Sequence, residues 1–283
     1  MNIALTAGLG VAAGALCEGI LMVMLLRMLT DAGAVRENFL GHKIPISLGI
    51  SFPVSVMLTY LLYGICQWYQ TSYHLFIVGL LAAALLGFID DMLGARDTLG
   101  FRGHFGALRQ GRLTTGGLKA LGGGTLALFL AFFHGGGLAD IILNTLIIAL
   151  FTNALNLFDL RPGRAIKVFL FFLAIIIVVG RTNSEFPLLA PLVGAVLCYF
   201  PLDLRARAMM GDAGSNVLGM VVGYTSILSL SLAWRCGFLG FLILLHIYTE
   251  KYSLSQTIER YSLLRAIDQL GRGPSHGKRT TLG

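Results

Sequence analysis

Residues 73–91 read YHLFIVGLLAAALLGFIDD, and this stretch decides the class of the fold. From Leu75 to Ile89 it carries no charged residue, and Asp90 and Asp91 follow directly. A transmembrane helix needs about 20 consecutive residues that are mainly apolar. The stretch therefore predicts a membrane span that ends in two carboxylates at the membrane surface.

Apolar stretches fill most of the chain on both sides of this one. Nine can be marked, at residues 3–29, 44–66, 73–89, 116–133, 138–157, 165–180, 186–202, 213–233 and 236–249. Of the 283 residues 56% are apolar and 12% charged, whereas soluble domains carry about 25% charged residues. We predict an all-α, polytopic transmembrane helical bundle of about nine spans over residues 1–249, followed by a polar cytoplasmic tail over 250–283. The composition excludes a soluble nucleic-acid binder, so no nucleic-acid partner is expected.

The basic residues alternate between the two sides of the predicted bundle. Segments 30–43, 90–115, 156–167, 203–212 and 250–283, with Arg27 and Lys119 at adjoining span ends, hold 19 of the 21 Lys and Arg residues. Cytoplasmic loops carry the excess of Lys and Arg in membrane proteins. We therefore expect a multi-pass protein of the cell membrane with its N-terminus outside and its C-terminus in the cytoplasm. The same segments hold most of the Asp and Glu residues, which this rule does not explain and a cation site would.

Three short polar motifs lie at the predicted cytoplasmic ends of spans. Asp90 and Asp91 end the third apolar stretch, and neighbouring carboxylates repel unless cations offset them. Asn153 and Asn156 are three residues apart and share one helix face. Asp212 opens the eighth stretch, between glycines that let a ligand approach the backbone. Solvated helix ends, interhelical hydrogen bonds and a helix cap are the structural alternatives for these motifs.

In this order the motifs resemble those of the polyprenyl-phosphate N-acetylhexosamine-1-phosphate transferases (glycosyltransferase family 4), which include phospho-N-acetylmuramoyl-pentapeptide transferase. The Phe-Ile-Asp-Asp segment is similar to the family's first aspartate motif, residues 153–159 to its Asn-x-x-Asn-x-x-Asp segment, and residues 210–215 to its Met-Gly-Asp-x-Gly-Ser segment. The resemblance runs from about residue 36 to residue 220.

The chain departs from the family pattern in two places. The family usually continues its second motif as Asp-Gly-x-Asp-Gly, whereas this chain reads Asp159-Leu-Arg-Pro-Gly163, with Pro162 in place of the second aspartate. The His-rich loop of the pentapeptide transferase is also missing. The chain therefore resembles a short, divergent member of the family.

The resemblance implies a Mg²⁺-dependent enzyme that transfers a sugar-1-phosphate from a nucleotide sugar, expected to be UDP-linked, to a polyprenyl phosphate in cell-envelope glycan synthesis. It implies that Asp90, Asp91 and Asp212 are catalytic and that Asp212 and Asp90 bind the metal. The expected substrate-binding residues are Lys43, Arg102, His104, Arg112, Lys119, Asn153, Asn156, Asp159 and Ser215.

Other classes of protein stay open at this stage. A non-catalytic scaffold of the same fold would bind polyprenyl lipid without turnover. A lipid transporter is a third class, because Glu18 lies within the first predicted span and intramembrane carboxylates often mark transport pathways. The sequence also leaves a homodimer open.

Overall fold

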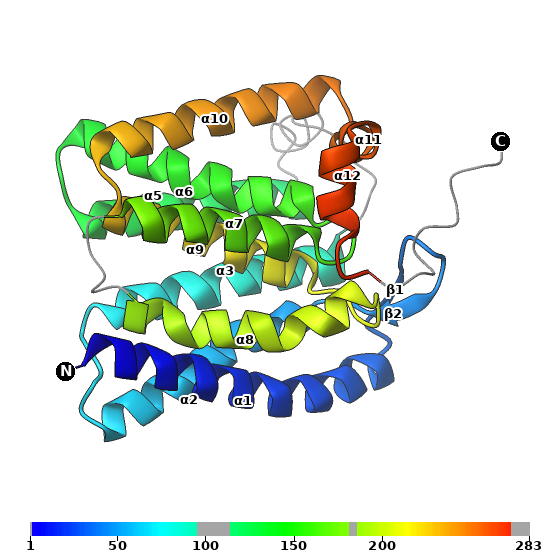
Figure 1. Ribbon diagram of the computed structural model, residues 1–283, viewed down its shortest axis with the longest axis horizontal. Coiled ribbons are helices and arrows are strands. Elements are labelled where there is room, and N and C mark those ends of the chain that lie inside the picture. The colour runs from blue at the N-terminus through cyan, green and yellow to red at the C-terminus, as the bar shows by residue number, and fades with distance from the viewer. Residues whose placement is uncertain (1, 95–113, 181–185, 273–283) are drawn as a thin grey trace.

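The computed structural model describes residues 2–94, 114–180 and 186–272, and within them the protein is a bundle of helices (Figure 1). Eight helices of 16 residues or more run along the bundle, together with the shorter α2. Their bounds are α1 Ile3–Asp31, α2 Ser51–Ile65, α3 Tyr73–Leu93, α5 Thr115–His134, α6 Leu138–Phe158, α7 Arg164–Val179, α8 Phe186–Leu204, α9 Gly211–Ser229 and α10 Leu232–Lys251. The predicted class, an all-α membrane bundle, is confirmed.

Each predicted apolar stretch coincides with one of these helices. Seven helical segments of the described chain are long and apolar enough to cross a membrane, and α2 reaches that length together with the preceding 3-10 turn Leu48–Ile50. The remaining two helices, α7 and α9, are not among these seven segments, for separate reasons. Helix α7 has 16 residues and spans about 24 Å at 1.5 Å per residue. Helix α9 contains many Gly, Ser and Thr residues.

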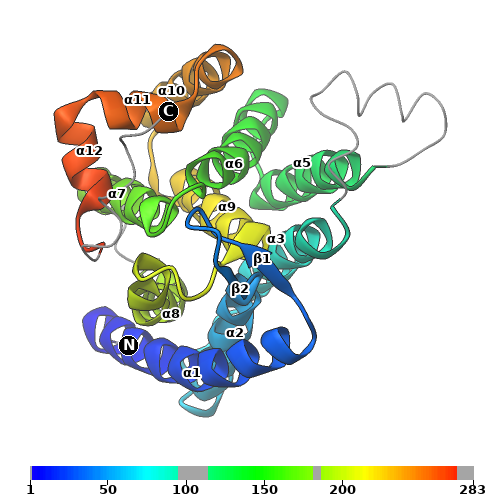
Figure 2. The same ribbon diagram turned by 90° about the vertical axis from the view of Figure 1, so that its right-hand side faces the viewer.

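Helix α9 is the centre of the bundle, and this position explains its composition (Figure 2). All of its residues except Asp212 and Leu228 are buried, and it packs against α3, α6 and α7. Small residues allow backbones to approach closely inside membrane bundles. A Cβ atom on Gly219 would lie 2.5 Å from the carbonyl oxygen of Phe151, so α6 and α9 are in backbone contact there.

One end of the bundle carries additional short elements, on the right of Figure 1. Strands β1 (Val35–Glu37) and β2 (Lys43–Pro45) pair in an antiparallel hairpin, and helices α11 (Leu254–Arg260) and α12 (Ser262–Gln269) follow α10. The second predicted span therefore starts later than expected, because residues 43–45 form a strand. The ninth is longer than expected, since α10 continues to Lys251.

The described parts of the five predicted basic segments all lie at this end of the bundle (Figure 1). The ends of α3, α6 and α8 and the starts of α7 and α9 meet there, and they carry Asp90, Asp91, Asp159, Asp203 and Asp212. That this end faces the cytoplasm remains a prediction.

Glu18, the basis of the transporter reading, lies between α1 and α2. Its carboxylate is fully buried and accepts hydrogen bonds from Ser51 Oγ at 2.5 Å and Ser55 Oγ at 2.7 Å. Both carboxylate oxygens thus have a partner within the packed bundle. This arrangement agrees with a structural role in joining the two helices.

Candidate active site

Side chains from three helices lie around the carboxylate of Asp212, which is at the start of a fourth helix, α9. Lys119 Nζ, from α5, forms an ion pair with Asp212 Oδ2 and lies 3.6 Å from Asp90 Oδ2, at the end of α3. Asn156 Nδ2, from α6, donates to the same Asp212 oxygen at 3.3 Å. The three charged side chains are partly exposed. The two carboxylates therefore share one positive charge at an accessible position.

Asp91 has a different environment from its neighbour Asp90. Its carboxylate is buried and accepts hydrogen bonds from Ser47 Oγ at 2.5 Å, Asp212 N at 3.0 Å and Ala213 N at 3.2 Å. The first backbone N–H groups of a helix have no partner within that helix. Asp91 therefore caps α9 and fixes the backbone that carries Asp212.

Local backbone geometry supports this capping contact. Gly211 has φ +67°, in the left-handed region that favours glycine, and a Cβ atom there would collide with the Asp91 carboxylate. Arg36 Nη2, from β1, donates to the Asp91 carbonyl oxygen at 2.8 Å, which brings the hairpin to the same end of α3. Arg36 was not predicted, and the signal for it was its place in a short basic segment before the second span.

The segment after α6 forms a second acidic region. Gly163 N donates to Asp203 Oδ2 at 2.7 Å, and Tyr199 Oη lies 3.5 Å from Asp203 Oδ1. Asp159 follows the last residue of α6. Burial, and then the negative charges of Asp203 and Asp212, raise the pKa of Asp159 well above its usual value. Asp203 was also not predicted, although it directly follows an apolar stretch just as Asp90 does.

Two cavities lie beside the Lys119–Asp212 ion pair, and each is lined by one of its two partners. The first, of about 370 Å³, lies between α3, α5, α6 and α9 and has a mainly apolar lining that includes Leu86, Met220, Lys119, Asn153 and Asn216. The second, of about 220 Å³, is lined by Asp212. Its other charged and amide-bearing lining residues include Arg36, Asp91, Asn156, Asp159, Arg161 and Asp203.

The other predicted site residues have separate places. Ser215 is fully buried, and its hydroxyl has no hydrogen-bond partner among the residues that the structure describes. Lys43 is exposed on β2 opposite Glu37 and lines neither of the two cavities. Arg102, His104 and Arg112 lie outside the described residues. The structure thus brings together Asp90, Asp91, Lys119, Asn156, Asp159 and Asp212, whose chemical roles stay predictions.

The donor set is suitable for a metal ion that also binds substrate. Within residues 2–94, 114–180 and 186–272, no three His, Cys, Asp or Glu side chains are arranged as ligands of one ion. Asp90 and Asp212, however, already face a single positive charge on Lys119. Mg²⁺ is commonly bound by one or two carboxylates together with substrate phosphates. Two carboxylate donors at this position fit that pattern.

Comparison with known proteins agrees with this arrangement. The family model described as Glycosyl transferase family 4 matches residues 73–230, more than half of the chain, and this region includes Asp90, Lys119, Asn156, Asp159 and Asp212. No curated protein sequence matches the chain significantly. The family match indicates transfer of a phosphosugar to a polyprenyl phosphate in general, and the apolar helices indicate a membrane protein. The chain belongs to glycosyl transferase family 4.

Proposed function

We propose that the protein transfers a sugar-1-phosphate from a nucleotide sugar, UDP-linked by expectation, to a polyprenyl phosphate at the cytoplasmic membrane face, in cell-envelope glycan synthesis. The products are a polyprenyl-pyrophosphoryl sugar and a nucleoside monophosphate. One observation carries the proposal: of the two partners of one ion pair, Lys119 lines an apolar cavity between membrane helices and Asp212 lines a cavity at the bundle end that carries charged residues.

The first cavity suits the lipid acceptor. Leu86 and Met220 give it apolar walls, and Gly123 and Gly124 leave the α5 side open. Lys119 lies on its lining, where an ammonium group can pair with the acceptor phosphate. An isoprenoid chain would thus lie between membrane helices with its phosphate beside Asp212.

The second cavity suits the donor. Arg36 and Arg161 line it together with Asn156 and Asp159. Guanidinium groups bind phosphate oxygens in a bidentate manner. The donor pyrophosphate would bind between them and Asp212.

The reaction follows from this placement of the two substrates. An oxygen of the acceptor phosphate attacks the donor phosphorus that carries the sugar. The bond from that phosphorus to the bridging oxygen breaks, and the nucleoside monophosphate leaves with the electron pair. Phosphoryl transfer depends mainly on positioning and on charge neutralisation. Lys119 supplies positive charge at the acceptor, and Asp91 keeps Asp212 in place.

The proposed metal site consists of Asp90 and Asp212. Mg²⁺ bound there would neutralise charge on the donor pyrophosphate. The three hydrogen bonds to the Asp91 carboxylate favour a positioning role for this residue over direct metal binding.

The test is release of nucleoside monophosphate by purified protein supplied with polyprenyl phosphate, Mg²⁺ and a panel of nucleotide sugars. We expect release with at least one donor and its loss in Asp212→Asn. Asp140→Asn is the matched control, because Asp140 pairs with Arg235 in a different ion pair, at the far ends of α6 and α10. Lipid binding without turnover for every donor would instead support the scaffold reading, and turnover by Asp212→Asn would contradict the site.

A further inference from the structure

Helix α12 has an unusual orientation of its two faces. Its apolar side chains Leu263, Leu264 and Ile267, with Leu270 just beyond it, recur at helical spacing and lie on one face. These side chains are 71%, 43%, 52% and 71% exposed, whereas Asp268, in the same helix, is 8% exposed. The helix therefore contacts the protein through Asp268 and leaves its apolar side chains exposed.

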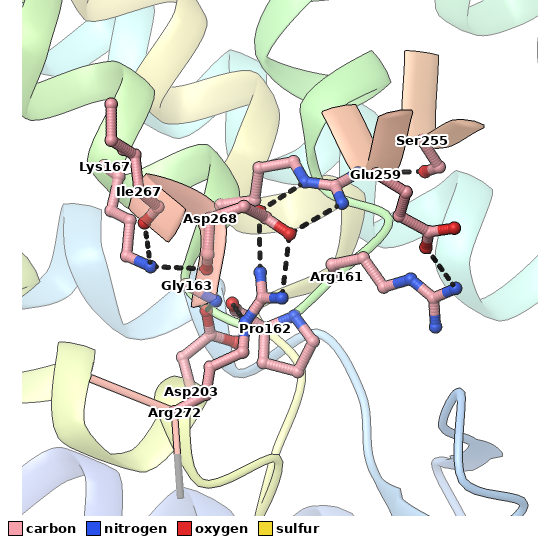
Figure 3. Close-up of polar contacts among 11 residues, drawn as sticks. Arg161, Pro162, Gly163, Lys167, Asp203, Ser255, Glu259, Ile267, Asp268 and Arg272 are labelled. Atoms are coloured by element: carbon pink, nitrogen blue, oxygen red, sulfur yellow. Dashed lines mark hydrogen bonds and ion pairs between the residues drawn. The ribbon is translucent and has the colours of Figure 1, made fainter. Parts of the chain in front are cut away.

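The inward side is fixed by a dense polar network (Figure 3). Asp268 accepts hydrogen bonds from Arg164 Nε at 2.7 Å and from Arg272 Nη2 at 2.8 Å. Lys167 Nζ donates to the carbonyl oxygens of Ile267 and Asp268, at 3.1 and 2.7 Å. The apolar outward face is thus held in place and does not result from a loosely attached helix.

The network also sets the level of α12 relative to the bundle. Arg164 and Lys167 belong to the first turn of α7, so α12 contacts α7 where that helix begins. In Figures 1 and 2, α12 crosses the end of the bundle at its outer edge, beside α7. Its apolar face therefore points away from the bundle at the depth where the long helices end.

The residues near α12 are of types that are common at membrane surfaces. Tyr248 and Tyr252, at the end of α10, are exposed and have ring centroids 5.0 Å apart. Arg260 at the end of α11 and Arg265 within α12 are also exposed. Tyr residues concentrate at membrane interfaces, and basic residues near them attract anionic headgroups.

We propose that α12 is an interfacial helix that binds an anionic lipid surface, with its four apolar side chains in the headgroup layer. Amphipathic helices with basic flanks lie in this layer with their apolar face toward the acyl chains. A second copy of the chain is a poorer occupant. A stable interface needs about 800 Å² from each partner, and four side chains on a two-turn helix offer much less.

The experiment measures the environment of position 263 in lipid vesicles. In a variant whose four cysteines are replaced by serine, Leu263→Cys is labelled with an environment-sensitive fluorophore. The full chain is reconstituted into phosphatidylcholine–phosphatidylglycerol vesicles. The control label is at Gln256, an exposed polar position of α11, and a label at 264 gives a second measurement. Quenching is measured with aqueous iodide and with lipids carrying a nitroxide at the headgroup or deep in the acyl chain.

We expect labels at 263 and 264 to be quenched several-fold less by iodide than the label at 256, and more by headgroup nitroxide than by the deep one. The protection should fall in vesicles of phosphatidylcholine alone, and further in Arg265→Gln. Equal iodide quenching at 263 and 256 would overturn the proposal. Protection that grows with protein density would indicate a second copy and would overturn it as well. No transferase activity enters the readout, so this result and that for the proposed function are independent.

Discussion

Asp268→Asn should detach the C-terminal helices from the segment beside the candidate site. Four hydrogen bonds reach the two Asp268 oxygens from Arg164 and Arg272, at 2.7 to 3.0 Å, and Arg164 is only 3% exposed. Removing one partner of a buried ion pair costs about 3–5 kcal/mol. Asparagine keeps one acceptor oxygen, so we expect the lower end, about 3 kcal/mol, or roughly a 100-fold shift toward the detached state.

Hydrogen–deuterium exchange of peptides covering residues 262–270 measures this shift, because exchange reports local opening. Because the same free-energy difference controls the opening of α12, we expect exchange to be roughly 100-fold faster in Asp268→Asn. Glu250→Gln is the control, since Glu250 is an exposed carboxylate just before these helices. Unchanged exchange in Asp268→Asn would refute the view that the Arg164–Asp268–Arg272 network holds α12.

The same network predicts the pH dependence of docking. Burial alone would raise the pKa of Asp268, but the hydrogen bonds and charges of Arg164 and Arg272 hold it below its usual range. A carboxylate whose pKa is lowered in the docked state stabilises that state above its usual pKa and loses the effect as the pH falls below it. The protection factor over 262–270, which is the exchange rate corrected for the intrinsic pH dependence of amide exchange, should therefore be constant from pH 8 to about pH 5 and fall only below about pH 4.

Further predictions concern the site and the bundle. Asp159→Asn should lower nucleoside monophosphate release but leave the melting temperature unchanged or higher. The reason is that the raised pKa of Asp159 makes its charged form oppose folding at neutral pH, so a lower melting temperature would contradict this prediction. Gly219→Ala should destabilise the protein by about 1–3 kcal/mol, because the added methyl group meets α6, whereas Gly240→Ala, with open space around it, should not. Pro162 replaces an acidic residue of the family pattern, so we expect a panel of nucleotide sugars to show that the protein discriminates weakly between nucleotide bases. A preference for uridine donors above about 100-fold, or roughly 2.7 kcal/mol, would contradict this expectation.

The sequence was sufficient to predict the bundle, because most of the spans are long and apolar enough to be recognised from their own residues. The stretch 73–89 is apolar from Leu75 onward, and its helix continues through Asp90 and Asp91 as expected. The meeting of Asp90 with Asp212 was also predictable, since both follow from span ends assigned to one side of the membrane. Such local patterns repeat along the chain and need no knowledge of the packing.

Contacts set by packing could not be predicted in this way. Asp268 pairs with Arg164 across 104 positions, and nothing near either residue indicates its partner. The different roles of Asp90 and Asp91 depend on which carboxylate faces the start of α9, which adjacent positions do not reveal. The hairpin was missed because Ile44, Pro45 and Ile46 continue the apolar pattern of the next helix.

The burial of α9 has a consequence for how the protein is made. Insertion of a helix into the membrane depends on its apolarity, and α9 is not among the seven segments that are apolar enough by themselves. It packs mainly against α3 and α6, which are synthesised earlier. We therefore expect α9 to enter the bilayer together with its neighbours and not as an independent unit. Asp212 would then reach Lys119 only at this late stage of biogenesis, so the nascent chain would have no working site until most of its helices had assembled.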